Sequence, residues 1–249
     1  MTFLDVPVSE RARIRAAGEA VGRLAFRHVG GVLIAPPPGS PGKLNSGSAF
    51  LLQMGQRHFL GTAAHVVKGG EDRIEADEAV LFQVGATRFD PRGRVAWRDD
   101  KRDIIFLELS SSEAQSTGLV ASTPTGGWPP PRAQEGDFVV VSGYPASGRR
   151  RLDGDPLEFR SLSFVLSVTA VHDDHFVCQF QREFWVPDGD ALLPPASEIG
   201  GMSGGPALLL GQLSYPIVGV VSEHSSSFEL MIISVLAGAP GIDILESAA

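Results

Sequence analysis

The sequence has a single cysteine, no excess of positive charge and no long apolar run. Cys178 cannot form an internal disulfide, so packing alone must hold the fold, as is usual in a reducing compartment. No stretch approaches the ~20 apolar residues of a membrane span, and the first residues lack the pattern of a secretion signal. The net charge of −8 is unsuited to binding a phosphate backbone. We therefore expect a cytoplasmic protein that binds neither membranes nor nucleic acid.

What the chain does have is enough apolar material for a core and many turn-forming residues. Of its 249 residues, 43% are hydrophobic and 20% are charged, so a sizeable core can form without metals or disulfides. The 29 glycines and 18 prolines indicate frequent tight turns, which separate short strands rather than long helices. The length fits one large domain or two small ones.

One amphipathic helix is predicted near the N-terminus, over residues 9–28. Ile14, Ala17, Val21 and Leu24 recur there at three- and four-residue steps between arginines. We expect this face to pack on the domain that follows. The helix is also a possible docking element for a regulatory partner or a fused domain.

The rest of the chain is predicted to form about a dozen short strands. The apolar runs are residues 32–34, 49–52, 58–60, 79–84, 104–109, 138–141, 162–171, 176–180, 207–210, 217–221 and 230–235. Residues 116–134 form a Pro- and Gly-rich connector without periodicity, which divides these runs into two similar groups. Two β-barrels joined by a linker fit this pattern.

A serine among glycines is the sharpest local feature, in Gly201-Met202-Ser203-Gly204-Gly205-Pro206. A serine hydroxyl is a weak nucleophile, so acyl transfer needs it exposed on a tight turn beside free backbone N–H groups. Glycines permit such a backbone. An ordinary Gly-rich turn between strands is the alternative.

Two further strings supply a base and a carboxylate. Thr62-Ala63-Ala64-His65 ends a strand with a histidine, which taken alone fits a structural core residue. Asp103-Ile104-Ile105-Phe106-Leu107 places a carboxylate at the start of a buried strand, which taken alone fits a turn cap. With Ser203, the chain order is His, Asp, Ser. Asp99 and Asp100 are weaker alternatives, because neither directly precedes an apolar strand.

These three strings resemble the histidine, aspartate and nucleophile motifs of the trypsin/chymotrypsin-like serine peptidases. The residues around Asn45–Leu52 and Gly136–Pro145 are similar to further strands of the bacterial, disulfide-free members. The resemblance covers roughly residues 30–240. It implies an all-β fold of two six-stranded antiparallel Greek-key barrels, with the N-terminal α-helix outside it.

The resemblance sets the expected domain boundaries. Residues 1–30 form the helical segment and residues 31–249 the peptidase domain. Within that domain, residues 31–115 form the first barrel, 116–134 the linker and 135–240 the second barrel.

The resemblance also implies a role for each motif residue in peptide-bond hydrolysis through an acyl-enzyme. Ser203 is the nucleophile, His65 the general base and Asp103 the residue that orients the imidazole. The backbone N–H groups of Gly201 and Ser203 form the oxyanion hole. The substrate is a protein or peptide, and no cofactor or metal is needed. A catalytically silent relative that uses the same groove to bind proteins is the alternative.

The substrate pocket and the activation mode depart from the family pattern. The pocket positions map to Ser197, Glu198, Ser222, Glu223 and His224. Glu198 favours a basic substrate side chain, His224 an acidic or small one and Ser197 a neutral one, so the cleavage residue stays open. Met202 occupies the position of the aspartate that pairs with a freed amino group in zymogens. We therefore expect no activation by cleavage, and we expect Val29-Gly30-Gly31 to be a turn.

Three other features have structural interpretations. His172-Asp173-Asp174-His175 lies between apolar runs and is predicted to be a hairpin turn rather than a metal site. Arg149-Arg150-Arg151 is followed by acidic residues, which favours a solvated loop over a docking site. Cys178 alternates with Phe176 and Phe180 and is predicted to be a core thiol.

Overall fold

The computed structural model describes residues 6–37, 44–76, 78–124, 126–146, 149–151, 157–180, 185–187, 199–211, 214–225 and 229–237. Its helices are α1 (Val8–Ala25), α2 (Ala64–Glu75) and α3 (Ser111–Ser116). The strands of the first half are β1 (Val29–Ala35), β2 (Asn45–Met54), β3 (Arg57–Ala63), β4 (Leu81–Val84), β5 (Thr87–Arg88), β6 (Val95–Asp99) and β7 (Ile104–Leu109). Those of the second half are β8 (Phe138–Gly143), β9 (Arg149–Arg151), β10 (Leu157–Phe159), β11 (Leu162–Val171), β12 (His175–Gln179), β13 (Trp185–Pro187), β14 (Pro206–Leu209), β15 (Ile217–Ser225) and β16 (Leu230–Val235).

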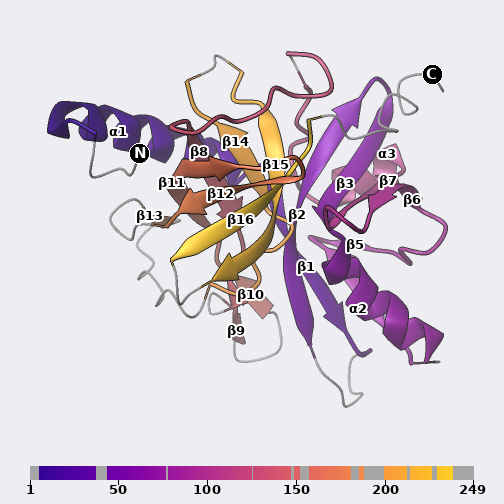
Figure 1. Cartoon of the computed structure of the whole chain (residues 1–249). Coiled ribbons are helices and arrows are strands. Elements are labelled where there is room, and N and C mark those ends of the chain that lie inside the picture. Colours follow the sequence, from indigo (N-terminus) through magenta and orange to yellow (C-terminus); the bar gives the residue numbers. More distant parts are fainter. Residues whose placement is uncertain are drawn as a thin grey trace.

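The strands form two antiparallel sheets that lie side by side (Figure 1). The first has the order β5-β4-β1-β2-β3-β7-β6 and curls into an open half-barrel. The second has the order β12-β16-β15-β14-β8-β11-β13, and the added pairing of β12 with β11 closes six of its strands into a barrel. The expected all-β, chymotrypsin-like two-barrel fold with an N-terminal helix is confirmed.

Strand β1 corrects one detail of the sequence analysis. Val29-Gly30-Gly31 is no turn, because these residues begin β1 and pair with β2, Val29 opposite Phe50 and Gly31 opposite Ser48. Val29 and Gly30 are buried. The two glycines suggested a turn, but a strand tolerates glycine where neighbouring groups approach closely.

Three apolar clusters fill the molecule. One lies inside the first sheet, around Leu60 and Ile105, and one inside the second barrel, around Leu166 and Ile233. The third lies between the two sheets and includes Phe106 of β7. Cys178 is fully buried, and burial raises the pKa of its thiol, so its assignment as a core thiol is confirmed.

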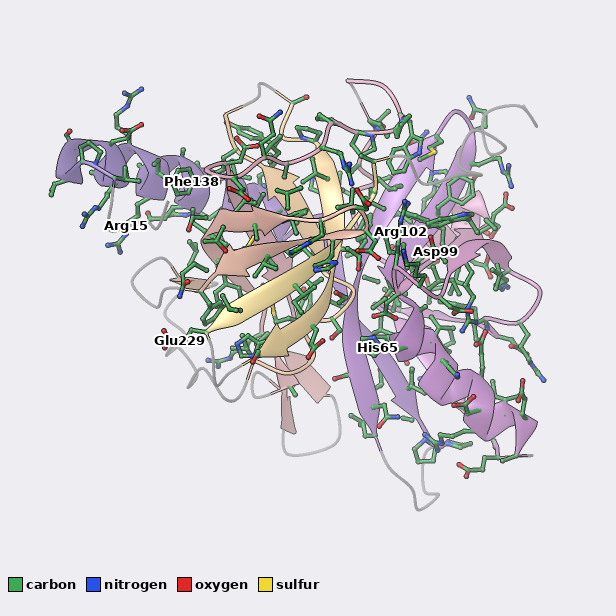
Figure 2. The ribbon with its side chains drawn as sticks, in the orientation of Figure 1. Arg15, His65, Asp99, Arg102, Phe138 and Glu229 are labelled. Carbon is green, nitrogen blue, oxygen red and sulfur yellow. The ribbon has the colours of Figure 1, made fainter. Side chains whose placement is uncertain are left out.

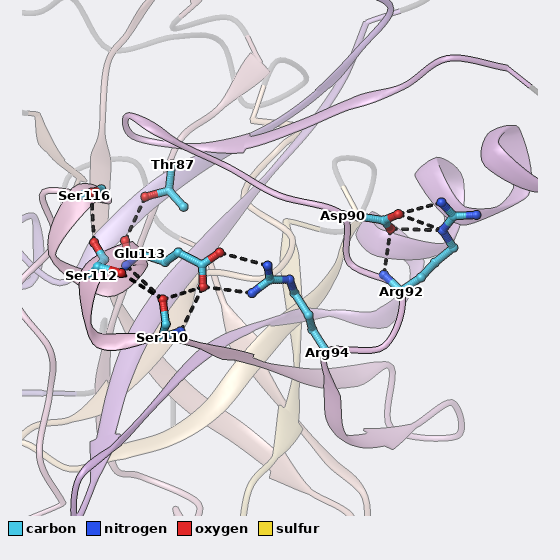
Figure 3. Close-up of polar contacts among 8 residues, drawn as sticks. All are labelled: Thr87, Asp90, Arg92, Arg94, Ser110, Ser112, Glu113 and Ser116. Carbon is cyan, nitrogen blue, oxygen red and sulfur yellow. Dashed lines mark hydrogen bonds and ion pairs between the residues drawn. The ribbon is translucent and has the colours of Figure 1, made fainter.

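The connection after the first sheet is fixed by a polar network (Figure 3). Ser110 and Glu113 form a reciprocal capping box at the start of α3. The Glu113 carboxylate also accepts two hydrogen bonds of 2.9 Å from Arg94. The Arg94 guanidinium, with further bonds from Ser110, lowers the pKa of Glu113 to about 2.

Helix α1 packs on the second barrel, against β8 and β11 (Figure 1). Its buried face consists of Gly18, Val21, Gly22 and Ala25. The expected face was wrong at two positions, because Ala17 is exposed and Leu24 is 46% exposed. The glycines let the helix approach the sheet so closely that a Cβ at Gly18 would overlap Val165. No described helix is both long and apolar enough to cross a membrane.

We predict that Gly18→Ala lowers the free energy of unfolding by about 1–3 kcal/mol, because the added methyl overpacks the contact with Val165. The matched control is Gly69→Ala in α2, where the nearest atom to an added Cβ is Asn45 Nδ2 at 3.5 Å. There the change should raise stability by about 0.5–1 kcal/mol through helix propensity. Urea unfolding measures both. Stabilisation by Gly18→Ala would contradict the close contact.

Candidate active site

His65 and Asp103 form a hydrogen-bonded pair at the start of α2. The Nδ1 atom of His65 lies 2.6 Å from Oδ2 of Asp103. The other carboxylate oxygen, Oδ1, accepts the backbone N–H of His65 at 2.8 Å. The first N–H groups of a helix have no intrahelical partner, and Ala63 at the N-cap supplies none. Asp103 therefore caps α2 and orients the imidazole with the same carboxylate.

Asp103 occupies an uncommon backbone conformation. Its φ is +56°, on the turn that leads from β6 into β7. Non-glycine residues in this region are strained, although aspartate tolerates it better than most. The turn is held because the Asp103 carbonyl accepts the N–H of Ala64 at 3.0 Å. Figure 2 labels Asp99 and Arg102 of the same segment, on the side of the first sheet that faces the second barrel.

Ser203 lies on a turn just before β14 of the second barrel. Its hydroxyl donates to the carbonyl of Ser222 at 3.4 Å, a length at which a hydrogen bond is weak. Among the described residues it makes no hydrogen bond to His65. Catalytic hydrogen bonds are often absent or long before substrate binds, and a weakly held, part-buried hydroxyl turns readily.

The backbone around Ser203 leaves two N–H groups free. Those of Gly201 and Ser203 donate no hydrogen bond to any described residue. The carbonyl of Gly200 is instead held by the N–H of Ala146, and the carbonyl of Met202 by the N–H of Gly205 at 2.9 Å. Because N–H and C=O point in opposite directions in a trans peptide, these bonds keep the N–H groups of Gly201 and Ser203 available.

Two clefts meet at the residues described above. One, of about 790 Å³, runs between the β6–β7 turn and β15, and the other, of about 350 Å³, lies beside β2 and α2. Both are lined by His65, Gly201 and Ser203. An extended chain could therefore run from one cleft into the other across the Ser203 hydroxyl.

Comparison with known proteins shows which family the sequence matches. The sequence profile described as "Trypsin-like peptidase domain" matches residues 47–212, about two thirds of the chain. This chain belongs to the trypsin-like peptidase family. The family and the fold support a peptidase. No curated protein matches the sequence.

One solved structure shares the fold of this chain, and two others show weaker similarity. A thermostable serine protease from an extremophilic microorganism is 15% identical, with 89% of this chain and 96% of that chain covered and a TM-score of 0.51. A protease from M. tuberculosis in its active form is 19% identical, with coverages of 94% and 86% and a TM-score of 0.48. A Glu endopeptidase is 14% identical, with coverages of 90% and 90% and a TM-score of 0.49.

The alternative carboxylates of this trypsin-like peptidase have other partners. Asp99 accepts the N–H of Arg102 at 3.0 Å, and Asp100 accepts from Arg98 at 2.6 Å. Asp103 alone of the three contacts His65.

The expected pocket residues are in part brought together. Ser222, Glu223 and His224 on β15 line the larger cleft with His65 and Ser203. The His224 ring packs on Phe180 with centroids 5.3 Å apart, and burial lowers its pKa. Its Nε2 is buried and has no partner among the described residues. Ser197 and Glu198 lie outside the described residues, so their place in the pocket stays a prediction.

An ion pair across the larger cleft was not predicted from the sequence. Lys101, two residues before Asp103, contacts Asp174 at 3.1 Å, and Asp174 also accepts from His175 at 2.7 Å. Asp174 lies in the β11–β12 hairpin, so that predicted turn is confirmed. The hydrogen bond from His175, followed by that from Lys101, lowers the pKa of Asp174 to about 2. Lys101 and Asp174 are far apart in the sequence, and no local pattern around either residue predicts their contact.

We predict that Asp174→Asn destabilises the protein at neutral pH, because Lys101 and His175 lose their carboxylate partner. The folded pKa lies below the ordinary value, so the stabilisation is complete above about pH 4 and fades as the pH falls towards 2. Urea unfolding of both proteins at pH 7 and at about pH 3 measures it. Asp173→Asn is the control, because no described residue pairs with that carboxylate. An effect that is equal at both pH values would contradict the ion pair.

Proposed function

We propose that the chain is a serine endopeptidase that hydrolyses peptide bonds through Ser203, His65 and Asp103. One observation carries this proposal. A carboxylate, an imidazole and a hydroxyl from three distant segments converge at the junction of two clefts, beside two backbone N–H groups that pair with none of the described residues. Each chemical role that acyl transfer requires has a candidate at that point.

The first step forms a tetrahedral intermediate, from which the acyl-enzyme arises when the C–N bond breaks. The Asp103 carboxylate accepts a hydrogen bond from the Nδ1–H of His65, an assignment of the proton that follows from this contact and leaves Nε2 as the base. The Ser203 hydroxyl turns from Ser222 to Nε2, gives up its proton and forms a C–O bond with the peptide carbonyl. The negative charge moves to the carbonyl oxygen, where the N–H groups of Gly201 and Ser203 stabilise it.

The second step releases the products. The imidazolium of His65 gives its proton to the leaving amine as the C–N bond breaks. Water then attacks the Ser203 ester, His65 takes its proton, and collapse of the second tetrahedral species frees the acid and restores the hydroxyl. Asp103 stabilises the imidazolium throughout. The cycle is balanced with water as the only co-reactant.

The two clefts favour an endopeptidase over an enzyme that trims chain ends. With Ser203 between them, substrate residues on both sides of the cleaved bond have space. Ser222 and His224 line the larger cleft. In this proposal the backbone of Ser222 pairs with an extended substrate, and His224 contributes to the wall of the substrate pocket. Docking of a regulatory partner or fused domain through residues 9–28 and a cytoplasmic location stay predictions from the sequence.

We predict that a fluorophosphonate probe labels Ser203, located by mass spectrometry of the digested adduct. Ser203→Ala should abolish this labelling, and His65→Ala should slow it at least about a thousandfold, because the hydroxyl loses its base. His172→Ala is the control, because this exposed histidine lies outside both clefts. A folded wild-type protein that takes up no label would favour the catalytically silent, protein-binding alternative.

We predict that Asp103→Asn lowers the rate of casein hydrolysis by about 10⁴-fold, because an amide cannot hold His65 in the required tautomer. Asp100→Asn should leave the rate within about threefold of the wild type, because that exposed carboxylate contacts Arg98 rather than His65. Equal losses in the two variants would exclude Asp103 as the orienting residue.

A further inference from the structure

Ser48 on β2 is the one fully buried side chain of the first sheet that bonds the turn carrying Ser203, within the described residues. Its hydroxyl donates to the carbonyl of Gly201 at 2.8 Å and accepts the N–H of Tyr144 at 2.8 Å. Its backbone N–H donates to the carbonyl of Ser203 at 2.8 Å. One residue of the first sheet thus contacts two segments of the second barrel.

These contacts complete the anchoring of the turn. The carbonyls of Gly200 and Met202 are held within the second barrel, by Ala146 and Gly205. The two carbonyls that remain, those of Gly201 and Ser203, are both held by Ser48. Because each peptide unit is planar, four held carbonyls leave the turn no free rotation. Ser48 also holds Tyr144, two residues before the N–H that binds Gly200.

Ser48 is itself fixed from the first sheet. The Thr62 hydroxyl, fully buried on β3, donates to the Ser48 carbonyl at 2.7 Å. Thr62 lies three residues before His65 on the same chain. The first sheet and the Ser203 turn lie very close together here, because a Cβ at Gly204 would overlap both the Ser48 carbonyl and the Thr62 hydroxyl. A chain of short contacts therefore connects the strand that leads to His65 with the turn that bears Ser203.

We propose that Ser48 is a positioning residue that sets the oxyanion-binding N–H groups of Gly201 and Ser203 in register with His65. This inference rests on the proposed function. The hydroxyl touches no reacting atom, and it acts by keeping the Gly201 carbonyl turned away from the cleft. Without it, the described residues hold the Gly201–Met202 peptide by one long bond, from the Met202 N–H to the Ile199 carbonyl at 3.3 Å. The peptide then rotates more easily, and the two N–H groups no longer converge on one oxygen.

The test compares Ser48→Ala with Ser163→Ala. Ser163 is an equally buried serine whose hydroxyl pairs with that of Ser142 at 2.6 Å, on the face of the second barrel that Gly22 of α1 covers. Each change removes one buried hydroxyl. We expect Ser48→Ala to slow fluorophosphonate labelling by about 10- to 100-fold, and Ser163→Ala to leave it within about threefold of the wild type.

A spectroscopic readout separates positioning from general stability. The phosphonyl oxygen of the Ser203 adduct occupies the place of the oxyanion, so its ³¹P chemical shift reports on the two N–H groups. This shift should move in the Ser48→Ala adduct and not in the Ser163→Ala adduct. Thr62→Val removes the hydroxyl that supports Ser48 and keeps a side chain of the same shape beside Gly204. It should change the rate and the shift in the same direction.

The outcomes distinguish the two proposals. Absence of labelling in the wild type overturns the proposed function and this inference with it. A labelled wild type with Ser48→Ala equal to Ser163→Ala overturns the positioning role alone. If Ser48→Ala does not fold, the same comparison of Thr62→Val with Ser163→Ala decides.

Discussion

The apolar cluster between the two sheets is the contact on which the candidate site depends. It joins Ile104 and Phe106 of the first sheet to Val140 and Val220 of the second barrel. Asp103 directly precedes Ile104, while Met202, beside Ser203, is buried in the core of the second barrel. Asp103 and Ser203 are thus each adjacent in the chain to a residue that close packing fixes in position. A shift of one sheet against the other would separate them.

Met202 holds this turn by apolar packing, where a charged side chain would need an ion-pair partner. A carboxylate buried there would require a cationic partner, whereas the thioether requires only contact. Met202 is 1% exposed and lies among the apolar side chains of the second barrel, and its Sδ approaches the position of a Cβ at Gly143 to 3.0 Å. Apolar packing of Met202, together with the hydrogen bonds to the carbonyls of the turn, therefore holds this segment.

The sequence allowed the two-barrel fold and the three motif residues to be predicted because short strings encode them. A glycine turn around Ser203 and an acidic residue before a buried strand are local signals. Val21 was predicted on the buried face of α1, but Gly18 and Gly22 were not, because glycine carries no hydrophobic signal. They are suited to this face because they allow the helix to approach the sheet closely. Asp174 and Lys101, or Ser48 and Gly201, are distant in the chain, and only the completed fold brings each pair together. The direction of the Ser203 hydroxyl depends on its side-chain rotamer, which the spacing of the motifs in the sequence does not indicate.

Helix α1 precedes the first sheet in the chain but packs on the second barrel. During synthesis it leaves the ribosome long before β8 and β11, which complete its binding surface. The first sheet can assemble in that interval, while the helix and its small-residue face remain in water. Helix α1 then docks when the second barrel closes. An early segment of the chain is thereby held by the half that forms last. Protection of the α1 amides from hydrogen exchange should therefore arise late in folding, together with that of β8.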